Sequence, residues 1–151
     1  MKRKQTLFLC LSAALITTAL AGDFDREIKA RQSFMQVLAY NNGLLANMVR
    51  GKVPYDAELA QTAALNLKLA AQMNMSSVWV VGSDMSVAGN DTKTKPELWS
   101  TWPKAGSYLT DLSEASALLD GVAGMGLKQM KAAFSDVGKA CSSCHKDFRA
   151  K

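Results

Sequence analysis

Residues 127–148 read LKQMKAAFSDVGKACSSCHKDF, and their spacing decides the fold. Apolar residues and two cysteines recur three and four positions apart, at Leu127, Met130, Phe134, Val137, Cys141, Cys144 and Phe148. This spacing is typical of an amphipathic α-helix with one face turned to a core. It predicts that the last helix of the chain packs into the core along the seam that holds both cysteines.

The same stretch contains Cys141-Ser142-Ser143-Cys144-His145, a C-x-x-C-H run of the kind that attaches c-type haem. The two thiols form thioethers with the vinyl groups of the porphyrin, and the next side chain places an imidazole nitrogen on the iron. On a helix, Cys141 and Cys144 share a face. The chain has one histidine, so a second histidine from this chain cannot be the sixth iron ligand. We expect one covalent haem c, bound by Cys141, Cys144 and His145.

Three other interpretations of this motif are weaker. A thioredoxin-like C-x-x-C would be expected near a βαβ pattern, whereas this one ends a helical sequence. A structural zinc site needs about four Cys or His ligands, and the mature chain would offer two cysteines and one adjacent histidine. A structural disulfide would leave His145 without a role.

The N-terminus has the pattern of a secretory signal peptide. Residues 1–5 are basic, residues 6–20 are apolar, and residues 19–21, Ala-Leu-Ala, resemble a cleavage site. Cys10 lies inside the apolar run behind Leu9, so we interpret it as discarded and not lipidated. The alternative is an uncleaved anchor, for which the run is short. We therefore predict a signal peptide at residues 1–21 and one exported domain at residues 22–151.

Removal of the signal peptide changes the charge of the chain. Lys2, Arg3 and Lys4 leave with it, which lowers the formal net charge from +5 to +2. The remaining basicity gives no support to nucleic-acid binding. No other segment is apolar over enough residues to span a bilayer. The expectation is a periplasmic protein without a membrane span, and c-type haem attachment outside the bacterial cytoplasm agrees with it.

Three further helices can be predicted upstream of residue 127. They are expected at about residues 25–50, 57–75 and 103–120, with apolar stripes at Ile28, Met35, Leu38, Leu45 and Val49, at Leu59, Ala63, Leu67 and Ala70, and at Tyr108, Leu112, Ala115 and Leu119. Asp56 is a plausible N-cap, and Gly51 and Gly121 are plausible stops. Residues 76–95 form a long crossover with one apolar patch, residues 78–81, which we interpret as a buried loop anchor and not a strand. Pro96 opens a short helical turn through Trp99. The pattern predicts an all-α fold, an antiparallel four-helix bundle with haem attached to its last helix.

A resemblance to a known family adds to this interpretation. The C-terminal haem motif, ARQS at residues 30–33, GKVPYD at 51–56, KPELWS at 95–100 and the run from Ala132 to Arg149 resemble the class II c-type cytochromes, the cytochrome c′ family. The resemblance covers essentially all of residues 24–151, and it implies the four-helix bundle. Only the haem motif is specific by itself.

The resemblance also implies roles for three residues. Met35 stands four positions after Arg31, where the family side chain faces the vacant side of the haem. High-spin members have a non-ligating residue there, whereas the low-spin cytochrome c-556 type uses a methionine as the sixth ligand, which this sequence resembles. The alternative is that Met35 only fills the core. Arg31 and Arg149 match arginines that lie beside the haem propionates or edge, and the alternative for each is a solvated surface charge.

The expected function is electron transfer by a periplasmic c-type cytochrome with His145 and Met35 as axial ligands. The cofactor supplies the chemistry, so we predict no catalytic residues and no enzyme. The alternative is a five-coordinate cytochrome c′ that binds nitric oxide or carbon monoxide. A peroxidase would need distal acid–base groups, and the expected distal stripe of Met35, Leu38 and Phe34 is apolar. The expected partners are periplasmic redox proteins, with a homodimer possible because family members include dimers.

Overall fold

The computed structural model describes residues 24–151, and in this range all regular secondary structure is helical apart from one isolated antiparallel bridge between Thr94 and Arg149. The four long helices are α1 (Asp25–Val49), α2 (Ala57–Ala71), α5 (Trp102–Asp120) and α6 (Leu127–Phe148). The short elements are η1 (Ser76–Val78), α3 (Met85–Ala88), η2 (Gly89–Asp91), α4 (Glu97–Ser100) and η3 (Ala123–Met125). The predicted signal peptide, residues 1–21, lies outside the described residues.

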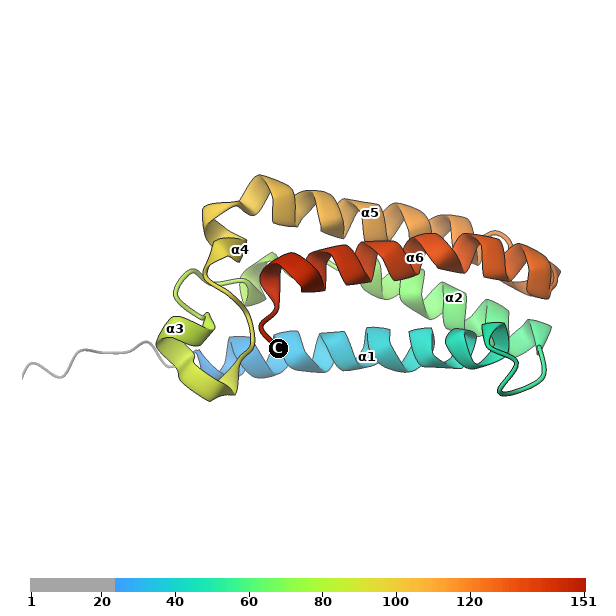
Figure 1. The fold of residues 1–151 in the computed structure, drawn as a ribbon, viewed down its shortest axis with the longest axis horizontal. Helices are drawn as coiled ribbons and strands as arrows, with labels where there is room; N and C mark the ends of the chain where they lie inside the picture. Colours follow the sequence, from blue (N-terminus) through green and yellow to red (C-terminus); the bar gives the residue numbers. More distant parts are fainter. Residues whose placement is uncertain (1–23) are drawn as a thin grey trace, which may run out of the picture.

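The long helices form an antiparallel bundle in which each helix reverses the direction of the one before it (Figure 1). α1 packs against α2, α2 against α5, α5 against α6, and α6 against α1. The connection from α2 to α5 lies at the end of the bundle where α1 begins and α6 ends (Figure 1). This confirms the predicted four-helix bundle. Within residues 24–151, no helix combines the length and hydropathy that a bilayer span requires.

Local sequence features explain where the helices begin and end. The Asp56 side chain accepts a hydrogen bond from the Leu59 amide at 3.0 Å and caps α2. Gly51 has φ +67°, a left-handed conformation that glycine adopts without strain, and it ends the turn after α1. α2 ends at Ala71, earlier than the predicted residue 75. The Met73 amide donates to the carbonyl of Ala70 at 3.0 Å and closes the last turn, and the Asn74 side chain then accepts a hydrogen bond from the Ser76 amide at 3.1 Å at the start of the crossover.

The core lies between the four long helices and follows the predicted stripes closely. Its members with at most 1% exposure include Leu45, Leu67, Leu119, Met130 and Val137. Leu59 and Leu127 were expected in the core and are 39% and 40% exposed, so these two predictions were wrong. The buried face of α2 starts one residue later, at Ala60, which leaves the Leu59 side chain toward solvent. Small alanines on this face let α2 approach its neighbours closely.

The apolar patch at residues 78–81 anchors the crossover, as predicted, although only part of it is buried. Val78 ends η1 and is 9% exposed, whereas Val81 is 73% exposed. Trp79 is half-buried and packs against a second, smaller core of Leu98, Ala105 and Phe148. The crossover is therefore fixed at the end of the bundle where α6 finishes.

Candidate haem-binding site

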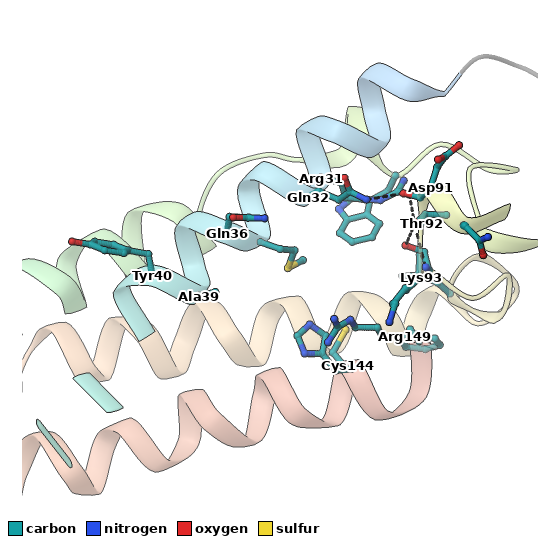
Figure 2. A pocket seen from close by; sticks show the side chains of 17 residues that line it. Arg31, Gln32, Gln36, Ala39, Tyr40, Asp91, Thr92, Lys93, Cys144 and Arg149 are labelled. Atoms are coloured by element: carbon teal, nitrogen blue, oxygen red, sulfur yellow. Dashed lines mark hydrogen bonds between the residues drawn. The ribbon is translucent and has the colours of Figure 1, made fainter. Parts of the chain in front are cut away.

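A cavity of about 780 Å³ lies between α1, the crossover and the end of α6. α1 contributes residues from Arg31 to Tyr40, and α6 contributes Cys144 and His145 (Figure 2). Ligand pockets in proteins commonly measure about 300–1,000 Å³. The cavity thus lies between the C-x-x-C-H motif of α6 and α1, the helix predicted to face it.

The three residues of the motif lie in the last two turns of α6. Cys141 and Cys144 are half-buried and unpaired. Cys141 packs against the main core, while Cys144 packs against the second core and lines the cavity with His145. The side chain of His145 is exposed on the cavity wall. One thiol, that of Cys144, and the imidazole of His145 therefore line the cavity, while Cys141 precedes them by one turn on the same helix and packs against the main core. The three residues keep the order that haem attachment requires.

The protonation of these groups argues against a redox-active dithiol. Desolvation by burial raises the pKa of both thiols, and with the nearby Cys141 and Asp147 it brings the pKa of Cys144 to about 11. A disulfide-exchange motif needs a cysteine whose pKa is lowered. Desolvation, followed by the charge of Arg149, lowers the pKa of His145, which favours the neutral imidazole that binds metals. Within residues 24–151, no group of three or more His, Cys, Asp or Glu could hold a metal ion such as zinc.

Met35 lies on α1 and lines the same cavity as His145. Its side chain is half-buried and packs against the main core on its other side. The expected distal stripe is wrong in part, because Leu38 is buried in the main core and Phe34 packs against it, and neither lines the cavity. Met35 is the member of that stripe that remains on the cavity wall.

Arg31 also lines the cavity, but its guanidinium group is directed into the crossover. Nη1 donates to the carbonyl of Val78 and to Oγ of Ser83, both at 2.8 Å. Nη2 donates to the carbonyl of Ser83 at 2.8 Å and to Oγ1 of Thr92 at 3.4 Å. The residue is 3% exposed, and desolvation lowers its pKa, opposed by the charge of Asp84. The solvated surface charge considered for Arg31 is therefore excluded.

Two tryptophans complete the surroundings of this arginine. The Arg31 guanidinium carbon lies 5.2 Å from the ring centre of Trp79 and 6.0 Å from that of Trp99. The Trp99 indole donates to the carbonyl of Trp79 at 2.9 Å. Cation–π contacts of this kind are stronger when the cation is desolvated. The crossover is thus fastened to α1 beside the cavity.

Arg149 caps α6 and lies at the mouth of the cavity. Its amide donates to the carbonyl of His145 at 3.1 Å, and its backbone forms the isolated bridge with Thr94. The side chain is exposed and, like Lys93 on the facing crossover segment, lines the cavity (Figure 2). The C-terminal tail and the crossover therefore close one side of the cavity together.

The residues present fit a haem. The cavity has the volume of a ligand site, apolar walls at Met35, Leu98 and Phe148 for a porphyrin, and cationic side chains at its mouth for two propionate carboxylates. When bound, haem c supplies an iron centre that changes oxidation state and accepts an axial ligand. Cys141 and Cys144 would hold it covalently, and His145 would bind the iron.

Several cavity residues were not predicted from the sequence. Gln36 and Tyr40 follow Gln32 at intervals of four on α1, so helical spacing alone could have placed all three on one face. Lys93 and Leu98 come from the irregular crossover and from α4, and no periodicity connects them with α6. Their position depends on how the crossover folds back on the bundle.

Comparison with known proteins identifies relatives along nearly the whole chain. The family model described as Cytochrome C′ matches residues 26–149. A cytochrome c′ from Cereibacter sphaeroides is 32% identical over 151 residues, which cover 98% of this chain and 99% of that protein. A cytochrome c-554 from Cereibacter sphaeroides is 33% identical over 131 residues, covering 87% of this chain and 98% of that protein. The relatives thus include proteins named as cytochromes c′ and as c-554.

Solved structures agree with these relatives. Cytochrome c′ from Rhodobacter sphaeroides has a TM-score of 0.83 and 32% identity over 86% of this chain and 99% of its own. A nitric oxide complex of a variant cytochrome c prime from Alcaligenes xylosoxidans has a TM-score of 0.72 and 26% identity over 85% and 97% of the two chains. A further cytochrome c′, described by its ligand-controlled dimer dissociation, has a TM-score of 0.78 and 28% identity over 86% and 98%. Homologues can therefore form homodimers.

The family match, the bundle and the cavity at the C-x-x-C-H motif lead to one assignment. Sequence identity and structural similarity both extend over the four helices and the crossover. The chain belongs to the cytochrome c′ family, whose members bind haem c covalently through a pair of cysteines, here Cys141 and Cys144.

Proposed function

We propose that this protein binds a small diatomic gas, nitric oxide or carbon monoxide, on the distal side of a five-coordinate haem c. The observation that carries the proposal is the match to cytochromes c′ along 98% of the chain. The nitric oxide complex among the structural neighbours belongs to a variant of one such protein. The chain has no second histidine to occupy the distal position.

Residues on two opposite sides of the cavity would have different roles. His145 on α6 would bind the iron, and Met35 on α1 would form part of the distal wall. Because Met35 also packs against the main core, its side chain is supported on the side away from the cavity. An apolar wall of this kind limits the space for a sixth ligand without contributing an acid or a base.

The second candidate is the electron carrier expected from the sequence, with Met35 as the sixth ligand. One observation favours it: the thioether of Met35 lines the same cavity as the imidazole of His145. Methionine opposite histidine raises the reduction potential of a haem. The comparisons support the gas-binding alternative better, because most of the named relatives are cytochromes c′. Electron transfer without Met35 ligation remains compatible with the first candidate.

Carbon monoxide binding to the ferrous protein separates the two candidates. In the five-coordinate protein, the observed rate rises in proportion to carbon monoxide concentration, because no ligand has to leave first. If Met35 is bound, the rate reaches a plateau set by its dissociation, and Met35→Leu removes the plateau. Met48→Leu is the matched control, since Met48 is 2% exposed on the same helix and does not line the cavity. A plateau that Met35→Leu abolishes and Met48→Leu preserves would reject the five-coordinate site on which the gas-binding proposal depends.

The location and partners form a separate part of the proposal. We propose export to the periplasm with cleavage after Ala21, followed by exchange of electrons with periplasmic redox proteins. The export and the cleavage rest on the basic and apolar pattern of residues 1–21, and the redox partners rest on the haem cofactor that the family binds. The intact mass of periplasmic material should equal residues 22–151 plus one haem. A mass that still includes Cys10 would contradict the cleavage.

A further inference from the structure

Among residues 24–151, the cavity wall contains three lysine and arginine side chains: Arg31, Lys93 and Arg149. Arg31 uses both terminal nitrogens for hydrogen bonds to the crossover. Within residues 24–151, neither Lys93 nor Arg149 forms an ion pair with a carboxylate. Two exposed cations therefore remain at the mouth of the cavity.

The backbone around Lys93 is held by the end of the chain. The Ala150 amide donates to the carbonyl of Lys93 at 2.8 Å, and the Lys95 amide donates to the carbonyl of Phe148 at 2.9 Å. The bridge between Thr94 and Arg149 lies between these two bonds. Lys93 and Arg149 consequently belong to one hydrogen-bonded unit, and their side chains lie on the same cavity (Figure 2).

We propose that Lys93, together with Arg149, holds the propionate carboxylates of the haem. A carboxylate that enters a partly buried cavity loses hydration and needs a charged or hydrogen-bonded partner. Lysine supplies a compact charge and arginine a planar fork that matches a carboxylate. The one carboxylate on the cavity wall, Asp91, is directed away from Lys93 and Arg149 (Figure 2).

This assignment changes the role implied for Arg31 by the resemblance. Arg31 is a positioning residue, because its hydrogen bonds fix residues 78–92, which lead directly into Lys93. The exposed Lys93 therefore makes the propionate contact that the resemblance implied for the buried Arg31. The inference rests on the covalent haem and not on whether Met35 binds the iron.

The reduction potential measured against pH tests the role of Lys93 in the haem-loaded protein. A cation beside a carboxylate lowers its pKa, and protonation of a propionate raises the potential of the haem. Lys93→Gln should therefore move the break in the potential–pH curve upward by about one pH unit. Lys93→Arg should restore the wild-type break. Frequencies of the propionate bending modes in resonance Raman spectra should shift with Lys93→Gln and return with Lys93→Arg.

Lys131→Gln is the matched control, because it removes the same charge from an exposed position on α6. It lies fourteen residues before His145, which corresponds to about 21 Å along a helix. A haem stain and thermal unfolding confirm that each variant is loaded and folded. If Lys93→Gln and Lys131→Gln show the break in the potential–pH curve at the same pH and the same propionate bending frequencies, the assignment is wrong. The spectra of the same samples report iron coordination separately, so a failure here is distinct from a failure of the proposed function.

Discussion

The guanidinium group of Arg31 lies over the ring of Trp79, with 5.2 Å between the guanidinium carbon and the ring centre. These residues belong to α1 and to the crossover, which are far apart in the sequence. Four hydrogen bonds from the same guanidinium reach the crossover at Val78, Ser83 and Thr92. One buried side chain thus fixes the irregular wall of the haem cavity to the bundle.

Replacement of Arg31 should destabilise the protein strongly. Arg31→Gln removes a buried charge contact over Trp79 and leaves the carbonyls of Val78 and Ser83 without their donor. We expect the free energy of unfolding of the haem-loaded protein to fall by about 3 kcal/mol in urea titrations. Arg26→Gln, at an exposed position of the same helix, should change it by less than about 0.5 kcal/mol. Equal effects of the two substitutions would show that Arg31 does not hold the crossover.

The hydroxyl of Tyr55 connects the start of α2 with the turn before α6. It donates to the carbonyl of Ala123 at 2.7 Å and accepts from the amide of Gly126 at 3.0 Å. Tyr55→Phe should lower the free energy of unfolding by about 1–2 kcal/mol, because two backbone groups lose their partner. Tyr40→Phe is the control, since Tyr40 is 69% exposed. Thermal unfolding of the two variants side by side checks this, and equal midpoints would contradict it.

Two glycines of the α6 region should respond to alanine in opposite directions. Gly126 has φ +128° and ψ +155°, and a Cβ there would lie 3.0 Å from Oε1 of Gln129. Gly126→Ala should therefore destabilise the protein by about 1–3 kcal/mol. Gly138 lies inside α6 with nothing within 4 Å of an added Cβ, so Gly138→Ala should stabilise it by about 0.5–1 kcal/mol. If Gly126→Ala and Gly138→Ala shift the urea unfolding midpoint in the same direction, this explanation of the turn before α6 is wrong.

The sequence predicted the bundle because four apolar stripes with helical spacing have few other ways to be buried. The bounds of α1 and α6 agree with the prediction to within one residue, while α2 ends four residues early, where the Met73 amide turns back to the carbonyl of Ala70. The periodicity does not reveal how far each stripe is rotated, which is why Leu59 was misplaced. Helical spacing thus predicts where a helix lies in the sequence better than it predicts which of its residues face the core.

The candidate site was predicted where it lies on regular helices. Cys144, His145 and Met35 line the cavity, as expected from their places on α6 and α1. Lys93 was missed because the crossover has no repeating pattern, and its position depends on hydrogen bonds to the C-terminal tail. The charge of Arg31 was noticed, but its burial and partners depend on the same irregular segment.

The coordination of the ferric iron in the wild-type protein tests the proposed function most directly. Electron paramagnetic resonance and near-infrared spectra of the haem-loaded protein at neutral pH report whether Met35 is bound. If the iron is five-coordinate, we expect a high-spin ferric signal and no methionine-to-iron band. Met35→Leu should then also give a high-spin signal without that band. A low-spin signal with that band, lost in Met35→Leu and kept in Met48→Leu, would contradict gas binding at an open distal site and make the protein a His145/Met35 electron carrier.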